Sequence, residues 1–195
     1  MAGSELQPFR QRSLGRFLTS WVRDPRAIGA VAPSSPMLAR LMVRGLCAGA
    51  RVVELGSGTG AVTQAILDTG VRECDLYLIE QDERFVDHLK RRFPGAATVQ
   101  ADATWVGEHL GELTDSVDFV ISGLPLLLFS DARKRRLLTA AFKLLGAGGA
   151  FHQFTYGGVC PVSKRLLGGL ELKASCLGFA AFNVPPAFVY RFEHA

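Results

Sequence analysis

The stretch Glu54-Leu55-Gly56-Ser57-Gly58-Thr59-Gly60 decides how this chain of 195 residues is expected to fold. It follows an apolar run that predicts a short buried strand over residues 51–55, and it precedes a helical pattern over residues 61–68. The glycines let the chain turn tightly out of the strand and let its backbone approach a ligand closely. A strand, a glycine turn and a helix in this order indicate a nucleotide-like ligand at the edge of an α/β sheet.

The rest of the chain continues the alternation of strands and helices. Further strands are predicted over residues 76–79, 97–100, 117–122 and 150–156, with a final pair over 170–177 and 188–193. Helices are predicted over residues 36–45, 83–92 and 131–145. Ser35 and Pro36 have the residue types that cap and open a helix. This alternation predicts an α/β fold, a three-layer sandwich around a mostly parallel sheet.

Composition narrows the class of protein. With 48% hydrophobic and 21% charged residues, the chain is globular and fits one domain. The four cysteines are widely spaced and form neither a zinc-ligand pattern nor a disulfide framework, so we expect no metal and a reducing cytoplasm. No run reaches the roughly 20 apolar residues that span a bilayer, so any membrane contact is expected to be peripheral.

The first 30 residues are expected to form a basic amphipathic segment, followed by a catalytic domain over residues 31–195. Five arginines face only two acidic residues in this segment, and Leu14, Phe17, Leu18 and Trp21 share one face of a helix predicted over residues 9–23. Such a helix suits an anionic membrane surface, and packing of its apolar face on the core is an equal alternative. A second basic run, residues 133–136, is expected to be a solvated helix face.

Three carboxylates follow or end the first three predicted strands: Glu54, Glu80 and Asp102. Because parallel strands end at one edge of a sheet, these side chains are expected to meet in one crevice. A carboxylate just before the glycines opposes a pyrophosphate but suits a cationic amino-acid group. Glu80 is placed to accept ribose hydroxyls, and Asp102 to meet an adenine amino group. S-adenosylmethionine has these groups and no phosphate, so it is the predicted cofactor, with S-adenosylhomocysteine as product.

Over residues 30–195 the pattern resembles the class I methyltransferases, a resemblance that implies a Rossmann-like sheet of seven strands with the last one antiparallel. In that superfamily the segment after the fourth strand helps select the acceptor. RNA adenine dimethyltransferases have Asn-Leu-Pro-Tyr there, whose amide and ring hold a flipped base. This chain has Gly123-Leu124-Pro125-Leu126 instead, which disfavours a nucleic-acid partner.

A closer resemblance is to the bacterial phospholipid N-methyltransferases. It rests on residues 17–21 (Phe-Leu-x-Ser-Trp), 28–35 (Ile-Gly-Ala-Val-Ala-Pro-Ser-Ser), 53–60, 122–127 (Ser-Gly-Leu-Pro-Leu-Leu) and 153–157 (Gln-Phe-Thr-Tyr-Gly). The resemblance implies stepwise methylation of phosphatidylethanolamine toward phosphatidylcholine by a cytoplasmic enzyme bound peripherally to the inner face of the membrane. The cofactor-binding residues that it implies are Glu54, Gly56, Ser57, Gly58, Thr59, Gly60, Glu80, Gln81, Asp102, Ala103, Ser122, Ser34 and Ser35.

On the acceptor side, Tyr156 ends the fifth predicted strand and is the candidate catalytic residue, because its hydroxyl can orient the amine or relay its proton. The candidate substrate-binding residues are Trp21, Gly123, Leu124, Tyr156 and Arg191. Cation–π contacts to a methylated ammonium are expected from Trp21, Phe154 or Phe182, and a cation for a lipid phosphate from Arg16, Lys164, Arg165 or Arg191.

His152, inside the fifth strand, is expected to be a core residue, and the protein is expected to be monomeric. Two other functions stay open at this point: a methyltransferase for RNA or for a small-molecule amine, and a cofactor-binding adaptor without catalysis.

Overall fold

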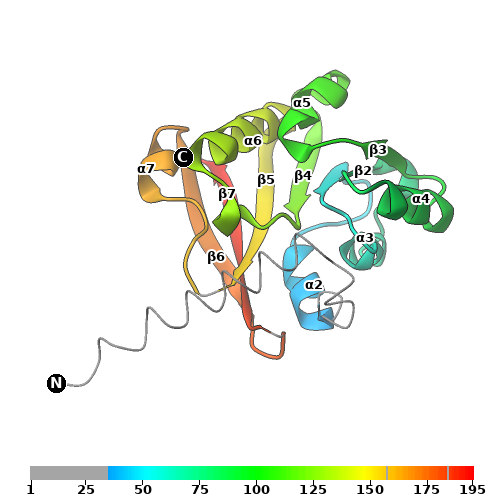
Figure 1. The fold of residues 1–195 in the computed structure, drawn as a ribbon, viewed down its shortest axis with the longest axis horizontal. Coiled ribbons are helices and arrows are strands. Elements are labelled where there is room, and N and C mark those ends of the chain that lie inside the picture. Colours follow the sequence, from blue (N-terminus) through cyan, green and yellow to red (C-terminus); the bar gives the residue numbers. More distant parts are fainter. Residues whose placement is uncertain (1–34, 157, 184) are drawn as a thin grey trace.

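The computed structural model describes residues 35–156, 158–183 and 185–195 (Figure 1). The predicted helix over residues 9–23, the boundary at residue 30, and the predicted site residues Trp21 and Ser34 lie outside the described residues. The strands are β1 Val52–Leu55, β2 Leu76–Glu80, β3 Ala97–Gln100, β4 Val117–Ser122, β5 Leu145–Tyr156, β6 Leu172–Ala180 and β7 Ala187–His194. The helices are α2 Pro36–Met42, α3 Ala61–Leu67, α4 Glu83–Arg92, α5 Val106–His109, α6 Asp131–Leu144 and α7 Lys164–Gly168. Short 3₁₀ turns are η1 Glu73–Asp75, η2 Ala103–Trp105, η3 Gly111–Leu113 and η4 Leu126–Leu128.

All seven strands form one sheet in the order β3-β2-β1-β4-β5-β7-β6. The strands from β1 to β5 are parallel to their neighbours, whereas β7 is antiparallel to both β5 and β6. The predicted seven-stranded sheet with an antiparallel last strand is therefore confirmed.

Helices cover both faces of the sheet because its strands carry apolar side chains on both sides. On one face, Leu38 and Met42 of α2 pack with Ile66 of α3 and Leu89 of α4. On the other face, the apolar side chains of α5, α6 and α7 pack together against the sheet. The predicted three-layer sandwich is thus confirmed, with the core divided between the two sides of the sheet.

Ser35 opens α2 as expected. Its Oγ accepts a hydrogen bond from the backbone N–H of Leu38 at 3.2 Å, and Pro36 occupies the first turn. The helix ends at Met42, before the predicted residue 45, because the chain reaches Gly45 in a left-handed conformation with a φ of 91°.

The largest difference from the predicted elements is the start of β5. The glycine-rich segment before Ala150 was expected to be a break, but β5 begins at Leu145. The pairing of β5 with β4 shifts register between Val117 and Phe119, which makes an irregular ladder. Glycine allows this because a Cβ on Gly149 would lie only 3.0 Å from the backbone oxygen of Val117. The short helices α5 and α7 were not predicted, since four or five residues are too few to show helical periodicity.

The strands from β1 to β5 all end at one edge of the sheet, which we call the carboxyl edge; it faces downward in Figure 1. Because β7 is antiparallel to β5, the turn over residues 181–186 between β6 and β7 lies at this edge too and extends beyond the tip of β5 (Figure 1). The first turn of α2 lies beside it, since the backbone N–H of Ser35 donates to Asn183 Oδ1 at 3.1 Å. The carboxyl edge is therefore where the predicted site must be sought.

Candidate active site

Residues 56–60, the glycine loop, connect β1 to α3 at the carboxyl edge. Gly56, Gly58 and Gly60 have φ values of 75°, 52° and 78°, a region that side chains with a Cβ rarely adopt. Gly60 is also confined by its neighbour, since a Cβ there would lie 2.6 Å from Phe93 Cε2. By contrast, a Cβ on Gly58 would meet nothing within 4 Å, so this part of the loop borders open space. The loop therefore needs glycine partly for its backbone conformation and partly for close packing.

Glu54 lies at the base of the glycine loop and is only 2% exposed. Thr63 Oγ1 of α3 donates a hydrogen bond of 2.6 Å to Glu54 Oε2. Burial raises the pKa of Glu54 to about 8, against the lowering effect of the Thr63 hydrogen bond, and the nearby charge of Glu80 adds to the rise. Without a cation beside it, this carboxyl is mostly protonated at pH 7, and a positively charged group that binds beside it must displace its proton.

Glu80 closes the glycine loop onto the end of β2. Its Oε2 accepts from the backbone N–H of Gly58 at 2.8 Å. Its Oε1 accepts from the backbone N–H groups of Gln81 at 2.8 Å and Asp82 at 2.9 Å. The carboxylate is thus fixed by three backbone donors, and Oε2, which accepts from only one of them, keeps a lone pair for a ligand hydroxyl.

Asp102 caps η2, which follows β3. Its Oδ1 accepts from the backbone N–H and the hydroxyl of Thr104, both at 2.9 Å, and Ala103 beside it is buried. Its Oδ2 pairs with Arg133 of α6 at 3.0 Å. Partial burial raises the pKa of Asp102, but the Thr104 hydrogen bonds and the Arg133 charge outweigh it, and the net pKa is lowered.

The basic run over residues 133–136 is largely exposed, as expected, and two of its arginines also contact aromatic rings. The Arg133 guanidinium lies 4.0 Å from the centre of the Phe129 ring, and that of Arg136 lies 4.6 Å from the centre of the Trp105 ring. These side chains hold the start of α6 against the segments that follow β3 and β4. Sequence spacing gave no signal for this, because the partners lie up to 31 residues away.

Residues 123–127, the acceptor loop, leave β4 and lie directly against the glycine loop. The backbone N–H of Gly123 donates to Leu55 O at 2.8 Å, and a Cβ on Gly123 would lie 2.9 Å from Gly56 O. Leu124 is held at both ends: its N–H donates to Ser122 Oγ at 3.3 Å, and its carbonyl accepts from Gln153 Nε2 at 2.8 Å. The predicted cofactor and acceptor segments therefore form one continuous structure.

Gln153 is a site residue to which sequence reasoning assigned no role. It is fully buried in β5 opposite Ser122, and its Nε2 also donates to Phe154 O at 2.7 Å. Its Oε1 is buried without a hydrogen-bond partner among the described residues. The two carbonyl acceptors fix which end of the amide is the nitrogen.

A narrow recess of about 10 Å³ lies where the acceptor loop meets the end of β5. It is lined by Leu124, Pro125, Leu126, Leu127, Phe154, Thr155 and Tyr156. The rings of Phe154 and Tyr156 lie 5.3 Å apart and nearly perpendicular. The recess thus joins the acceptor loop to the candidate catalytic tyrosine.

Tyr156 is linked to α2 through a residue that was predicted only as part of a connection. Burial raises the pKa of Tyr156, and a hydrogen bond with the Asn183 side chain opposes the rise. Asn183 in turn accepts from the backbone N–H of Ser35 and donates to Pro185 O at 2.8 Å. Asn183 therefore connects the predicted acceptor side with the predicted cofactor side.

Comparison with known proteins identifies this arrangement. Residues 52–149 match the family described as "Methyltransferase domain". The chain belongs to the S-adenosylmethionine-dependent methyltransferases. It is 35% identical to a protein named ornithine lipid N-methyltransferase from Singulisphaera acidiphila, over 71% of this chain and 76% of that protein.

Solved structures confirm the fold of this methyltransferase. A TehB-like SAM-dependent methyltransferase from Corynebacterium glutamicum is similar with a TM-score of 0.65 and 16% identity, over 93% of this chain and all of that one. Phosphoethanolamine N-methyltransferase 1 of Haemonchus contortus, solved with phosphoethanolamine and S-adenosylhomocysteine, is similar with a TM-score of 0.60 and 15% identity. That match covers 100% of this chain and 51% of the other.

The residues of the methyltransferase fit S-adenosylmethionine. The buried carboxyl of Glu54 would suit an ammonium group, the Glu80 carboxylate a hydroxyl, and the open space at Gly58 a ligand close to the backbone. Among residues 35–156, 158–183 and 185–195, no group of three or more His, Cys, Asp or Glu is placed to hold a metal ion. Within the same residues, no helix is long and apolar enough to cross a membrane.

Two other predicted residues of the methyltransferase lie within the sheet. His152 is fully buried, its Nδ1 donates to Met42 O at 2.8 Å, and burial lowers its pKa to about 4. It is therefore a neutral core residue, as expected. Arg191 of β7 pairs with His152 of β5, and its Nε donates to Glu193 Oε2 at 2.6 Å. His152 lies four residues before Tyr156 in β5, so Arg191 is well away from the end of that strand. This position does not bring Arg191 together with the residues that line the recess.

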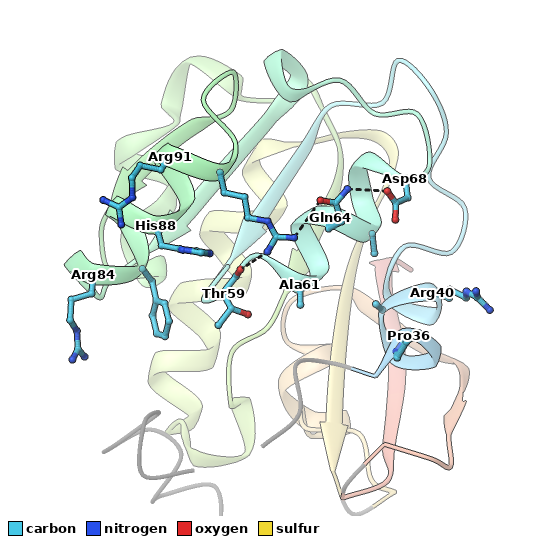
Figure 2. Close-up of a pocket in the computed structure, with 13 residues that line it drawn as sticks. Pro36, Arg40, Thr59, Ala61, Gln64, Asp68, Arg84, His88 and Arg91 are labelled. Carbon is cyan, nitrogen blue, oxygen red and sulfur yellow. Dashed lines mark hydrogen bonds between the residues drawn. The ribbon is translucent and has the colours of Figure 1, made fainter. Parts of the chain in front are cut away.

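A pocket of about 940 Å³ lies elsewhere in the methyltransferase, between α2, α3 and α4 (Figure 2). It touches the glycine loop only at Thr59, whose carbonyl accepts from Arg92 at 3.0 Å. His88 points into this pocket, whereas Arg84 and Arg91 point away from it (Figure 2). The three predicted carboxylates do not line it.

Proposed function

We propose that this methyltransferase transfers methyl groups to the headgroup amine of a membrane lipid, with phosphatidylethanolamine as the first candidate substrate. The main support is the position of the acceptor loop and the end of β5, whose apolar and aromatic side chains lie beside the glycine loop. The acceptor loop has no counterpart of the asparagine and tyrosine that hold a base, because Gly123 and Leu126 stand at those positions.

A second candidate substrate is an ornithine lipid, and one observation favours it. The relative that is 35% identical to this chain is named for that activity. Both lipids present a primary amine on a headgroup that is anchored in a bilayer by acyl chains. The shared chemistry, an amine at a membrane surface, is therefore the core of the proposal.

S-adenosylmethionine supplies an electrophilic methyl group on a sulfonium. The protein must then place a neutral amine in line with that methyl, since an ammonium has no lone pair to donate. Tyr156 is suited to hold the amine, because it lines the recess and its raised pKa keeps the phenol protonated at neutral pH. Its hydroxyl oxygen can accept from the amine N–H and so orient the nitrogen lone pair.

The aromatic walls of the recess suit the methylated product. Phe154 and Tyr156 present neighbouring rings to the same space. A methylated ammonium is a cation that is poorly hydrated and binds well to aromatic faces. Because the recess of about 10 Å³ has room for about one water molecule, a methylated ammonium would reach both rings only after these side chains move apart.

We further propose that the protein is a cytoplasmic, monomeric enzyme bound peripherally to the inner face of the membrane. Residues 1–30 hold Arg10, Arg12, Arg16, Arg23 and Arg26 against Glu5 and Asp24, a balance that favours anionic lipid.

The decisive experiment uses methyl-labelled S-adenosylmethionine with three acceptors: vesicles with phosphatidylethanolamine, vesicles with ornithine lipid, and RNA. Label in mono-, di- and trimethylated phosphatidylethanolamine is the expected result. Label only in ornithine lipid would move the proposal to the second substrate, and label only in RNA would reject both lipids.

The role of Tyr156 is tested by Tyr156→Phe, which removes the hydroxyl but keeps the ring. We expect turnover to fall roughly ten- to a hundredfold, because the amine loses its orienting group. Binding of S-adenosylhomocysteine, measured by calorimetry, should stay within about twofold. Unchanged turnover would remove the polar role of Tyr156 and leave only its ring.

A further inference from the structure

Large apolar side chains are exposed beside the recess. Met37 in the first turn of α2, Val159 after β5, Phe179 near the end of β6 and Phe182 in the β6–β7 turn are all exposed, and we call these four the apolar patch. Phe182 is 87% exposed, more than any other large apolar residue among the described ones. Single exposed apolar residues are common on protein surfaces and do not indicate binding. Four of them at one edge of a domain indicate an interaction surface.

Contacts between the segments place the four residues around the same end of β6 and β7, with Met37 and Phe179 on opposite faces of the sheet. Asn183, next to Phe182, accepts from the backbone N–H of Ser35, which brings the turn to the start of α2. The Phe179 ring stacks on that of Phe188, with centroids 4.5 Å apart. A Cβ on Gly158, next to Val159, would lie 3.4 Å from the same Phe188 ring.

The patch also adjoins the recess. Tyr156, which lines the recess, is hydrogen-bonded to Asn183, and Phe182 directly precedes Asn183. The β6–β7 turn extends past the ends of the neighbouring strands (Figure 1). A flat partner that touches the turn would therefore lie over the mouth of the recess.

The charge of the surrounding segments shows which kind of flat partner fits. Residues 35–50 and 174–190, which hold α2 and the parts of β6 and β7 nearest the turn, contain no aspartate or glutamate. Their cations are Arg40 and Arg44, and Arg44 Nη1 donates to Leu177 O of β6 at 2.9 Å. A protruding apolar tip on segments without negative charge is suited to insert into a leaflet that contains anionic lipid.

We propose that the β6–β7 turn is a membrane-inserting element, with Phe182 at its tip, that seats the carboxyl edge of the sheet on an anionic leaflet. This inference rests on the proposed function, because only a lipid substrate requires the enzyme to contact a membrane. A lipid amine that stays anchored in its bilayer can reach Tyr156 only if this edge faces the membrane. The turn is distinct from the basic segment over residues 1–30, so the two would act together.

The test measures binding of the full chain to vesicles of phosphatidylcholine with and without phosphatidylglycerol, in the absence of cofactor and of any amine lipid. We expect Phe182→Ser to weaken binding to the anionic vesicles about tenfold or more, because one phenyl ring no longer leaves water. Phe182→Trp should restore binding. Cys74→Ser, a change to an exposed side chain in η1 before β2, at the opposite edge of the sheet, should leave it unchanged.

Unchanged binding by Phe182→Ser would overturn the inference, and so would an equal loss in Cys74→Ser. A change from dimer to monomer in Phe182→Ser without loss of vesicle binding would also overturn it, because a second copy of the chain would then cover the patch. Since these vesicles hold no methyl acceptor, failure of the inference is distinguishable from failure of the proposed substrate. Methylation of phosphatidylethanolamine in detergent micelles reports on the substrate alone.

Discussion

At the scale of a single residue, Glu54 couples cofactor binding to pH. Its pKa is raised to about 8 by burial, so the free protein holds a proton on this carboxyl at neutral pH. A cofactor ammonium favours the ionised form, and binding must then release that proton. We expect the affinity for S-adenosylmethionine to rise about tenfold per pH unit between pH 5.5 and 7.5, as measured by calorimetry.

Glu54→Gln is the matched control for this prediction. It keeps the shape and removes the charge, so the affinity should fall about ten- to a hundredfold at pH 7.5 and lose its slope with pH. The pH dependence of the free energy of unfolding of the cofactor-free protein is an independent test of the raised Glu54 pKa. Since the folded pKa lies above the unfolded value of 4.5, Glu54 makes the native state less stable as pH rises from about 4.5 to 8. An affinity slope in Glu54→Gln equal to that of the wild type would contradict the assignment.

Gln153 is the residue whose removal should disturb the acceptor loop most directly. Its Nε2 is the shared donor to the carbonyls of Leu124 and Phe154. Gln153→Leu leaves both carbonyls without this donor, so we expect a loss of about 2 kcal/mol in the free energy of unfolding by urea. Turnover should fall while S-adenosylhomocysteine still binds, because the glycine loop is untouched. A variant with wild-type stability and turnover would show that the Leu124 carbonyl does not need this hydrogen bond.

At the scale of elements, the glycine loop and the acceptor loop are in direct backbone contact at Gly123. Gly123→Ala would place a methyl group 2.9 Å from Gly56 O and 3.6 Å from Leu55 O, and both neighbours are backbone atoms that cannot rotate away. We expect a cost of about 1–3 kcal/mol in the free energy of unfolding and weaker binding of S-adenosylmethionine. The control is Gly111→Ala in η3, where a Cβ meets nothing within 4 Å and stability should not change. Equal effects of the two substitutions would show that the loops separate easily.

Most helices and strands could be predicted because the sequence signals that determine them lie within each segment. The bounds of α4, β3 and β4 agree with the predicted ranges of residues 83–92, 97–100 and 117–122, because apolar periodicity and the capping residues lie within each segment. The carboxylates at the strand ends were predictable for the same reason. Gln153 and Asn183 were not assigned roles, because their partners Leu124 and Ser35 lie 29 and 148 residues away in the sequence. Such contacts follow from strand order, which no local pattern determines.

At the scale of the whole molecule, association with a membrane is a sum of many weak charges. We expect replacement of Arg10, Arg12, Arg16, Arg23 and Arg26 by Gln in the full chain to weaken binding to phosphatidylglycerol vesicles at least about a hundredfold, since each contributes about 1 kcal/mol near an anionic surface. Binding by the wild type should weaken as salt is added, because exposed charges are screened. Binding of S-adenosylhomocysteine should not change. Vesicle affinity that is insensitive to both the substitutions and salt would show that these five arginines do not bind the protein to the anionic surface.

The position of β7 has a consequence for folding during translation. This strand comes last in the order of synthesis among the described elements, yet it lies in the interior of the sheet between β5 and β6. Until the ribosome has made residues 187–194, both neighbours have an open edge with unpaired backbone groups, beside side chains such as Phe151 that are later buried. A chain interrupted before Ala187 would thus be prone to aggregation and proteolysis and would not persist as a smaller domain. Only a translation product that includes β7 can join β5 and β6 in one sheet.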